Sequence, residues 1–401
     1  MEGRKDREGA AQLRAAYSSC GGSQAQGAPT ACAAVVPDGS VPPDGNGRFD
    51  APPPREPPKP AYAALDLGTN NCRLLVARPS RRGFKVIDAF SRIIRLGEGV
   101  SASGRLSEAA IERTIQALQV CAAKIERHHV VRSGLIATEA CRLAANAGEF
   151  LGRARDETGL DIRIVNRETE AKLAVSGCAS LIDFACDFVL VFDIGGGSSE
   201  LIWLDLSRHK HLWRRSVAER LEVQRCIAAW TSLPVGVVTL AEHFGGQFVN
   251  REMFDAMVGH VVDMLAPFES EHRLRRGLSR GNAHLLGTSG TVTTVAGVHM
   301  RLPRYERNRV DGCWLDIAEV RAVTASLLDA TYEQRVAEPC IGRERADLVL
   351  AGCAILEAML QMWPCERLRV ADRGLREGIL ATLMAEDGVY RSERRGGYWR
   401  R

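Results

Sequence analysis

Two stretches of the chain, residues 63–77 and 189–204, repeat one plan: an apolar strand, an aspartate, a glycine-rich turn and a second apolar strand. Aligning the two stretches places Asp66 on Asp193 and Leu74 on Leu201. The repeat predicts two copies of one hairpin, with their turns facing each other.

The glycine-rich turns predict a phosphate site. Glycine leaves no Cβ between the main chain and a ligand, successive backbone N–H groups can converge on an anion, and neutral hydroxyls and amides add donors. An ordinary tight hairpin is the alternative for either copy alone, and neither turn matches a dinucleotide-binding motif or a P-loop. The candidate phosphate-binding residues of the turns are Gly68, Thr69, Asn70, Asn71, Gly195, Gly196, Gly197 and Ser198.

Three carboxylates next to these turns are candidate metal ligands. Asp66 and Asp193 end buried strands, where they can hold Mg²⁺ or another divalent cation together with substrate phosphates. Glu200 follows the second turn, and strand alternation puts it on one face with Ser198, where it can orient metal-bound water or a hydroxyl.

Composition limits the classes of protein that this chain can be. With 401 residues and 45% hydrophobic content, it is long enough for two or three domains. The first 60 residues hold ten of the sixteen prolines and predict a disordered, Pro/Gly-rich tail. No run of 18 apolar residues occurs, so we expect a cytoplasmic protein without a membrane partner. The twelve cysteines include no CxxC pair and are expected to be buried free thiols.

The net charge of +4 is small for this length, but it hides basic clusters. Solvated surface is the first interpretation of each cluster, and a track for a polyanion is the second. The distribution of these basic residues does not indicate binding to a specific nucleic acid. The clusters cover residues 273–280, 301–309 and 391–401.

Hydrophobic periodicity predicts strands alternating with helices. After the first hairpin, a further strand leads to a helix capped by Ser107, and a later helix begins near Asn166. This βββαβαβα order suits an open sheet backed by helices, and it restarts at residue 189. We therefore expect two α/β domains enclosing a cleft, at residues 61–184 and 185–386. The last helix either stays with the second domain or packs back on the first, and a basic tail covers 387–401.

Nine motifs together resemble the exopolyphosphatase and guanosine pentaphosphate phosphohydrolase family. They are DLGTNNCRLL, RLGEGV, ATEACRLAANAGEFL, NRETEAKL, DIGGGSSEL, SLPVGVVTLAE, LLGTSGTVTT, RNRVDGCWL and ADRGLREGIL, in that order. The resemblance implies two duplicated ribonuclease-H-like domains around a central cleft, as in actin, Hsp70 and sugar kinases. It also implies a metal-dependent enzyme that releases terminal orthophosphate.

The resemblance also implies roles for residues outside the two turns. The family's catalytic base falls on Glu170, whose place in the first turn of a helix would otherwise suggest only a helix-dipole role; Glu200 is the competing candidate. Arg142 matches a recurring arginine that either contacts phosphate or makes a salt bridge. A matching turn adds Thr288, Ser289 and Gly290 as phosphate-binding candidates.

The chain departs from the family in two places. Asn71 stands where a serine is usual, which leaves metal and substrate preference open. The extra helical domain of long members does not follow the last motif. Any extended polyphosphate track is therefore shorter here or completed by a second copy in a homodimer.

Three functions follow from these observations. The first is an exopolyphosphatase acting on inorganic polyphosphate, with guanosine pentaphosphate as a further substrate. The second is a phosphotransferase of the same fold, resembling sugar or acetate kinases. The third is a sensor that binds alarmone nucleotides without turnover.

Overall fold

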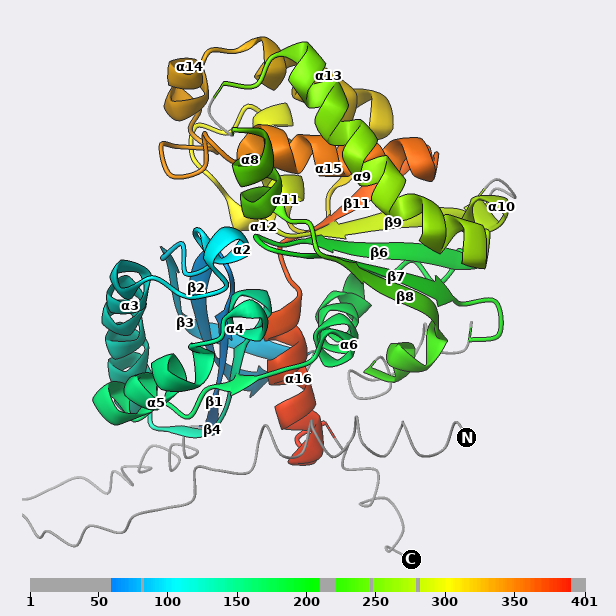
Figure 1. Cartoon of the computed structure of the whole chain (residues 1–401). Coiled ribbons are helices and arrows are strands. Elements are labelled where there is room, and N and C mark those ends of the chain that lie inside the picture. The colour runs from blue at the N-terminus through cyan, green and yellow to red at the C-terminus, as the bar shows by residue number, and fades with distance from the viewer. Residues whose placement is uncertain (1–58, 81–82, 210–220, 246–247, 279–281, 391–401) are drawn as a thin grey trace, which may run out of the picture.

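The computed structural model describes residues 59–80, 83–209, 221–245, 248–278 and 282–390. Most of the two predicted tails lies outside these residues. The chain forms two lobes, a lower one drawn in blue to cyan and an upper one drawn in green to orange (Figure 1). The predicted fold class, two duplicated α/β domains around a central cleft, is confirmed.

The lower lobe is built on a five-stranded sheet with the order β3-β2-β1-β4-β5. The first three strands are antiparallel neighbours, whereas β4 runs parallel to β1 and β5 runs parallel to β4. The strands are β1 Ala61–Leu67, β2 Asn71–Ser80, β3 Gly83–Ile93, β4 Val130–Ala137 and β5 Arg163–Ile164.

The upper lobe repeats this arrangement in a six-stranded sheet with the order β10-β11-β9-β6-β7-β8. Hairpin β6-β7 corresponds to hairpin β1-β2, and β9 pairs parallel with β6 as β4 does with β1. The strands are β6 Phe188–Ile194, β7 Ser199–Asp205, β8 Ile227–Leu233, β9 Ala283–Thr288, β10 Trp314–Asp316 and β11 Arg367–Ala371.

Helices cover both faces of each sheet, and local sequence signals set where they begin. The Ser107 hydroxyl accepts a hydrogen bond from the Ala110 N–H at the start of α3, and the Asn166 side chain does the same for α6. The lower lobe has α2 Val100–Ser103, α3 Glu108–Arg127, α4 Glu139–Leu143 and α5 Ala147–Thr158, and α6 Arg167–Cys178 with the 3₁₀ turn Ala179–Leu181 leads to the upper lobe. There follow the 3₁₀ turn Leu221–Cys226, α8 Val237–Phe244, α9 Arg251–His272, α10 Leu274–Leu278, α11 Gly290–His299, α12 Arg307–Val310, α13 Ile317–Asp329, α14 Tyr332–Ala337, α15 Val349–Met362 and α16 Leu375–Glu386.

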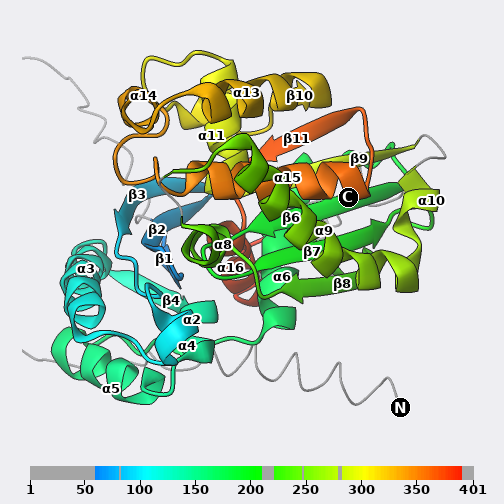
Figure 2. The ribbon, with the colours of Figure 1, turned by 45° about the horizontal axis from the view of Figure 1, so that its top comes forward.

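Strand alternation explains why both faces of the sheets are buried. In β1, Ala63 and Leu65 pack with α3 and α5, while Tyr62 and Ala64 pack with α16. In the upper sheet, Leu190 packs with α9 and α15 on one face, and the neighbouring residues pack with α6 on the other. Figure 2 shows α9 and α15 over the upper sheet and α3 beside the lower one.

The helices α6 and α16 cross between the two sheets. Although α16 is last in the described sequence, it lies against β1, β2 and β4 of the lower lobe (Figure 1). Although α6 precedes the boundary predicted at residues 184 and 185, it joins the core of the upper sheet through Ala171, Val175 and Cys178. Its Leu173 joins the core of the lower sheet. Glycines allow this crossing, because a Cβ on Gly177 would lie 1.8 Å from the Gly374 oxygen and one on Gly378 would lie 2.0 Å from the Leu173 oxygen.

Two further expectations concern cysteines and membrane segments. The described cysteines are all free thiols and most are buried, which confirms the prediction for them. Within the part of the chain that the structure describes, no helix is both long and apolar enough to cross a membrane.

Candidate active site

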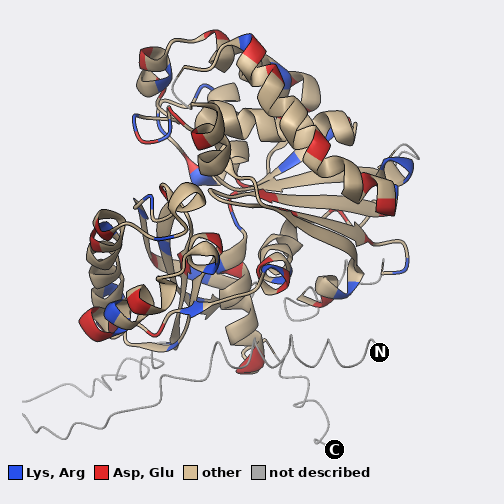
Figure 3. Cartoon of the chain, in the orientation of Figure 1, with Lys and Arg blue, Asp and Glu red and all other residues tan. Residues whose placement is uncertain are grey.

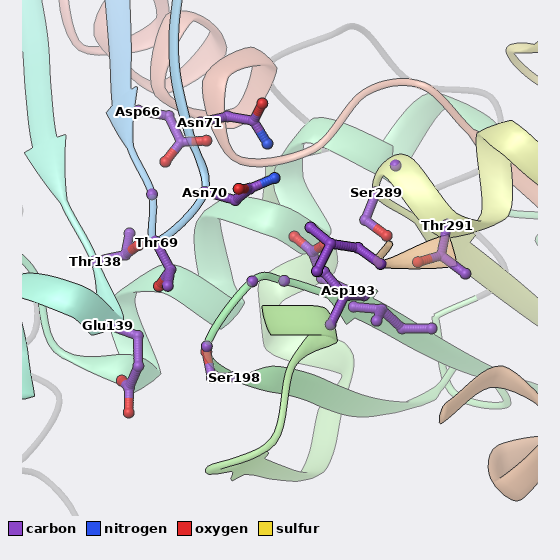
Figure 4. Close-up of a pocket in the computed structure, with 18 of the residues that line it drawn as sticks. Asp66, Thr69, Asn70, Asn71, Thr138, Glu139, Asp193, Ser198, Ser289 and Thr291 are labelled. Atoms are coloured by element: carbon purple, nitrogen blue, oxygen red, sulfur yellow. The ribbon is translucent and has the colours of Figure 1, made fainter. Parts of the chain in front are cut away.

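The turns of the two hairpins face each other across a pocket of about 140 Å³, which we call the central pocket. Figure 4 shows the first turn above and the second turn below, with Asp66 and Asp193 on opposite sides. All eight residues predicted in the turns line it. So do Asp66, Arg73, Thr138, Glu139, Glu170, Asp193, Ile194, Glu200, Val237, Ser289, Gly290, Thr291, Thr294, Arg345, Leu348, Val349 and Leu375.

Glycine is required in the second turn because the two turns touch. A Cβ on Gly196 would lie 3.0 Å from the Thr69 Cβ, and one on Gly197 would lie 2.8 Å from the Thr69 hydroxyl. Neither residue has a positive φ angle. These two glycines therefore serve close approach rather than an unusual backbone conformation.

Three buried polar atoms of lining residues have no hydrogen-bond partner in the structure. They are the side-chain oxygens of Asn70 and Asn71 and the hydroxyl of Ser289. Ser289 also has a φ of 98°, a strained value for a residue with a side chain. Buried polar groups are rarely left without partners, so the three atoms indicate the place of a polar ligand.

Four buried carboxyl groups meet at the pocket and disfavour one another's charge. Burial raises the pKa of Asp66, which the nearby Arg73 lowers in part. Burial, together with Glu170 and Asp66, raises the pKa of Asp193 to about 7. Burial and a neighbouring carboxylate likewise raise the pKa values of Glu170 and Glu200. The cluster is short of positive charge, which a cation would supply.

Glu170 differs sharply from the other acid in the first turn of α6. Its carboxylate is buried and accepts a hydrogen bond of 2.7 Å from Arg142. Glu168 instead points outward and pairs with Lys172 on the same helix. Burial and the neighbouring Glu200 raise the pKa of Glu170 above its usual range, and Arg142 offsets part of this rise. A raised pKa suits a general base that works near neutral pH.

Arg142 makes contacts with carboxylates, which is the salt-bridge alternative of the sequence analysis. It donates to Glu170 and, through Nε at 2.7 Å, to Glu139. Glu139 is almost completely buried and also accepts from Arg167 at 2.6 Å. Arg142 does not line the central pocket, so it holds the Glu170 carboxylate in place rather than contacting the pocket's contents.

The predicted metal ligands do not form a ready-made cage. Within the residues that the structure describes, no group of three or more His, Cys, Asp or Glu side chains is arranged to hold a metal ion. Glu200 accepts hydrogen bonds from Ser198 at 2.7 Å and from Ser232 at 2.9 Å. One or two carboxylates with substrate phosphates suffice for Mg²⁺. Asp66 and Asp193, whose negative charge is only partly compensated, fit this kind of binding.

The third turn contributes unequally to the pocket. Ser289 and Gly290 line it, whereas the Thr288 hydroxyl donates to the Arg373 carbonyl oxygen and faces a neighbouring cavity.

Arg73 lines the central pocket but was not among the predicted site residues. It lies opposite Asp66 in the register of the first hairpin, as Glu200 lies opposite Asp193 in the second. The alignment of the two hairpins places Arg73 on Glu200, so the sequence could have identified Arg73 as a candidate site residue.

A second cavity of about 780 Å³ adjoins the central pocket and is lined by seven arginines. We call it the arginine cavity. Arg307 and Arg373 pair with carboxylates, but within the described part of the chain the other five make no ion pair with one. Burial lowers the pKa values of Arg345 and Arg376, and the nearby Arg73 lowers both further. The five are Arg73, Arg92, Arg343, Arg345 and Arg376.

The arginines of this cavity come from scattered positions in the sequence. Of the basic clusters considered as a polyanion track, residues 301–309 contribute Arg307, the described part of 273–280 does not line the cavity, and 391–401 lies outside the described residues. Figure 3 shows basic segments where the upper lobe meets the lower one. Folding, rather than local sequence, gathers this positive charge.

We expect Asp193→Asn to raise the free energy of unfolding of the metal-free protein by about 2 kcal/mol at pH 8. Because folding raises the pKa of Asp193 from about 4 to about 7, its stabilising effect is complete below pH 4 and is lost as pH rises through 7. At pH 8 the folded parent must hold Asp193 ionised in a site that disfavours its charge, whereas the neutral asparagine avoids this destabilisation. Thermal unfolding with a chelator at pH 5 and pH 8 measures the difference, and equal stability of parent and variant at pH 8 would contradict the expectation.

The fold and the site together define a two-lobed phosphate-handling protein of the actin-like α/β class. The sequence model of the Ppx/GppA phosphatase family matches residues 75–387. The chain belongs to the Ppx/GppA phosphatase family.

Solved structures agree with this assignment. The Aquifex aeolicus member of the family is 28% identical, with a TM-score of 0.65, and the match covers 82% of this chain and 99% of that one. An exopolyphosphatase-like protein is 25% identical, with a TM-score of 0.69 and coverage of 81% and 99%. An exopolyphosphatase from Cytophaga hutchinsonii, at 21% identity, a TM-score of 0.70 and coverage of 81% and 98%, shares the fold.

Proposed function

We propose that this protein is an exopolyphosphatase, which removes terminal orthophosphate from inorganic polyphosphate. One observation carries the proposal: five arginines that make no ion pair with a carboxylate of the described residues line a cavity that adjoins the central pocket, where the buried Glu170 lies. Of the five, Arg92 and Arg343 are exposed and the other three are half-buried, and guanidinium groups without a carboxylate partner are common partners of phosphate oxygens. The cavity is also lined by acids, but its seven arginines outnumber them, so its net positive lining and its size suit a long polyanion; the acids are Asp66, Asp193, Glu344, Asp372 and Glu377.

The terminal phosphate occupies the central pocket in this proposal. Backbone N–H groups of the two turns and the Ser289 hydroxyl can donate to it, whereas the unpartnered amide oxygens of Asn70 and Asn71 are acceptors that suit a cation or a water beside the phosphate. Arg73 and Arg345 line both cavities, so they contact the phosphates at the junction. The remaining chain extends into the arginine cavity.

Glu170 accepts a proton from the attacking water. The water oxygen bonds to the terminal phosphorus, the bond from that phosphorus to the bridging oxygen breaks, and the bridging oxygen stays with the shortened chain. Arg142 orients the Glu170 carboxylate, and Glu139 fixes Arg142 in turn. Mg²⁺ held by Asp66 or Asp193 would neutralise charge on the phosphate oxygens.

The test is phosphate release with Mg²⁺ from long-chain polyphosphate, tripolyphosphate and guanosine pentaphosphate. Release from long-chain polyphosphate in preference to the others supports the proposal, and preference for guanosine pentaphosphate reassigns the substrate. Binding without release would favour the sensor hypothesis. ATP formation from ADP would favour a phosphotransferase.

The double variant Arg92→Gln and Arg343→Gln is expected to raise KM for long-chain polyphosphate by about tenfold, because two charge-assisted contacts to the chain are lost. Both residues line the arginine cavity but not the central pocket. Tripolyphosphate is too short to need them, so its KM should not change. Steady-state kinetics with both substrates checks this. Arg304→Gln, at an exposed arginine outside the cavity, is the matched control, and an equal effect there would contradict the assignment.

Guanosine pentaphosphate is the second candidate substrate. Phe90 and Tyr305 line the arginine cavity and offer aromatic surface that a nucleobase can contact. The Tyr305 hydroxyl already donates to Asp372 at 2.8 Å, which fixes its ring. The comparison of substrates above decides between the two.

A further inference from the structure

A third cavity of about 270 Å³ also adjoins the central pocket. Asn70 and Leu348 line both the central pocket and this third cavity, which shares no lining residue with the arginine cavity. The central pocket therefore adjoins two separate cavities, which have no lining residue in common. Residues of α8 line the third cavity, and α8 of the upper lobe meets the start of α2 of the lower lobe through the contact of Glu242 with Gly99 (Figure 1).

Asn70 separates the third cavity from the central pocket. Its side-chain oxygen is buried and has no hydrogen-bond partner. Its backbone oxygen accepts hydrogen bonds from the N–H groups of Ile94 and Arg95. The first phosphate turn is thus tied directly to the segment that forms the wall of the third cavity.

Two contacts between the lobes close the outer end of this cavity. Arg95 pairs with Asp347 at 3.0 Å, and the Gly99 N–H donates to the Glu242 carboxylate at 3.0 Å. The Arg95 side chain is 36% exposed, and a partly exposed ion pair contributes at most about 1 kcal/mol. Both contacts are weak enough to open during a catalytic cycle.

The charges of the two outer cavities differ. The arginine cavity carries unpaired cations that retain a polyanion, whereas Arg95 is the cation of the third cavity and already has a partner. The acids there also have donors: Glu98 pairs with Arg113, Asp347 with Arg95, and Glu242 with a backbone N–H. The second carboxylate oxygen of Asp347 is buried without a hydrogen-bond partner, and the lining holds one cation against three acids, so the third cavity offers no unpaired cation that would retain a phosphate.

We propose that orthophosphate leaves the central pocket through the third cavity, past Asn70 and between Arg95 and Asp347, while the shortened polyphosphate stays in the arginine cavity. The inference rests on the proposed exopolyphosphatase activity. A chain that fills the arginine cavity blocks that route for the small product. A separate exit lets hydrolysis continue without release of the chain.

Two substitutions of one residue test the exit. Glu242→Trp places a bulky side chain across the mouth of the cavity, and Glu242→Ala removes the same contact with Gly99 without filling the space. Acid-quenched samples measure cleavage of polyphosphate in the first turnover, and a fluorescent phosphate-binding protein measures release. Gel electrophoresis of the remaining polyphosphate shows whether partly shortened chains accumulate.

For Glu242→Trp we expect the parental rate of first cleavage, about tenfold slower phosphate release and an accumulation of partly shortened chains. Glu242→Ala should behave as the parent does. An active parent with parental release in Glu242→Trp, or equally slow release in both variants, would overturn the exit alone. A parent protein that releases no phosphate from polyphosphate would overturn the proposed function as well.

Discussion

Glu170→Gln is expected to reduce phosphate release from polyphosphate by about a thousandfold, the usual contribution of a general base. The amide keeps the size and a hydrogen-bonding oxygen of the carboxylate but cannot accept a proton from water at neutral pH. The loss should appear in kcat rather than in KM, because the arginines that bind the chain are unchanged. Steady-state phosphate release with long-chain polyphosphate and Mg²⁺ measures it.

Glu168→Gln is the matched control for this experiment. Glu168 lies in the same first helical turn, but its side chain is exposed and pairs with Lys172. This variant should keep parental activity. Equal activity of parent and Glu170→Gln would exclude Glu170 as the base and transfer the role to Glu200, the competing candidate, which is also buried and lines the central pocket.

Gly177→Ala is expected to lower the free energy of unfolding by about 3 kcal/mol, since the added methyl group has no room. Its Cβ would lie 1.8 Å from the Gly374 backbone oxygen, and a backbone atom cannot rotate away as a side chain can. The helices α6 and α16 would have to separate. Because α6 carries Glu170, activity should fall together with stability. Thermal or urea unfolding and phosphate release are the two measurements.

Gly152→Ala supplies the corresponding control in α5. Gly152 is also inside a helix, but a Cβ there meets no atom within 4 Å. Alanine should therefore stabilise the protein by up to about 1 kcal/mol through its higher helix propensity. Similar stability changes in the two variants would show that helix propensity, and not the close crossing, determines the effect at Gly177.

The sequence predicted the framework of the site better than its surroundings. The two turns, Asp66 and Asp193 could be found because the repeat is local and each turn needs glycine. The start of α3 at Ser107 and of α6 at Asn166 could also be found, since a cap acts within a few residues. Glu170 required the family resemblance, because acids in a first helical turn are common.

The arginine cavity could not be predicted from sequence patterns. Its arginines lie far apart in the chain, from Arg73 to Arg376, and only the crossing of strands and helices brings them together. The local basic clusters gave no guide to it. The role of Arg142 was left open for a similar reason, because its partners Glu139 and Glu170 lie on two different helices.

The position of α16 has a consequence for how the protein is made. The inner face of the lower sheet is covered by Ile379, Leu380 and Leu383, which leave the ribosome some 300 residues after β1. Until then, apolar residues of β1 such as Tyr62 and Ala64 lack their final partner. The lower lobe cannot finish folding as an independent unit during synthesis, unlike domains that fold in order from the N-terminus. A nascent chain stopped before residue 375 would leave this face exposed and open to chaperone binding.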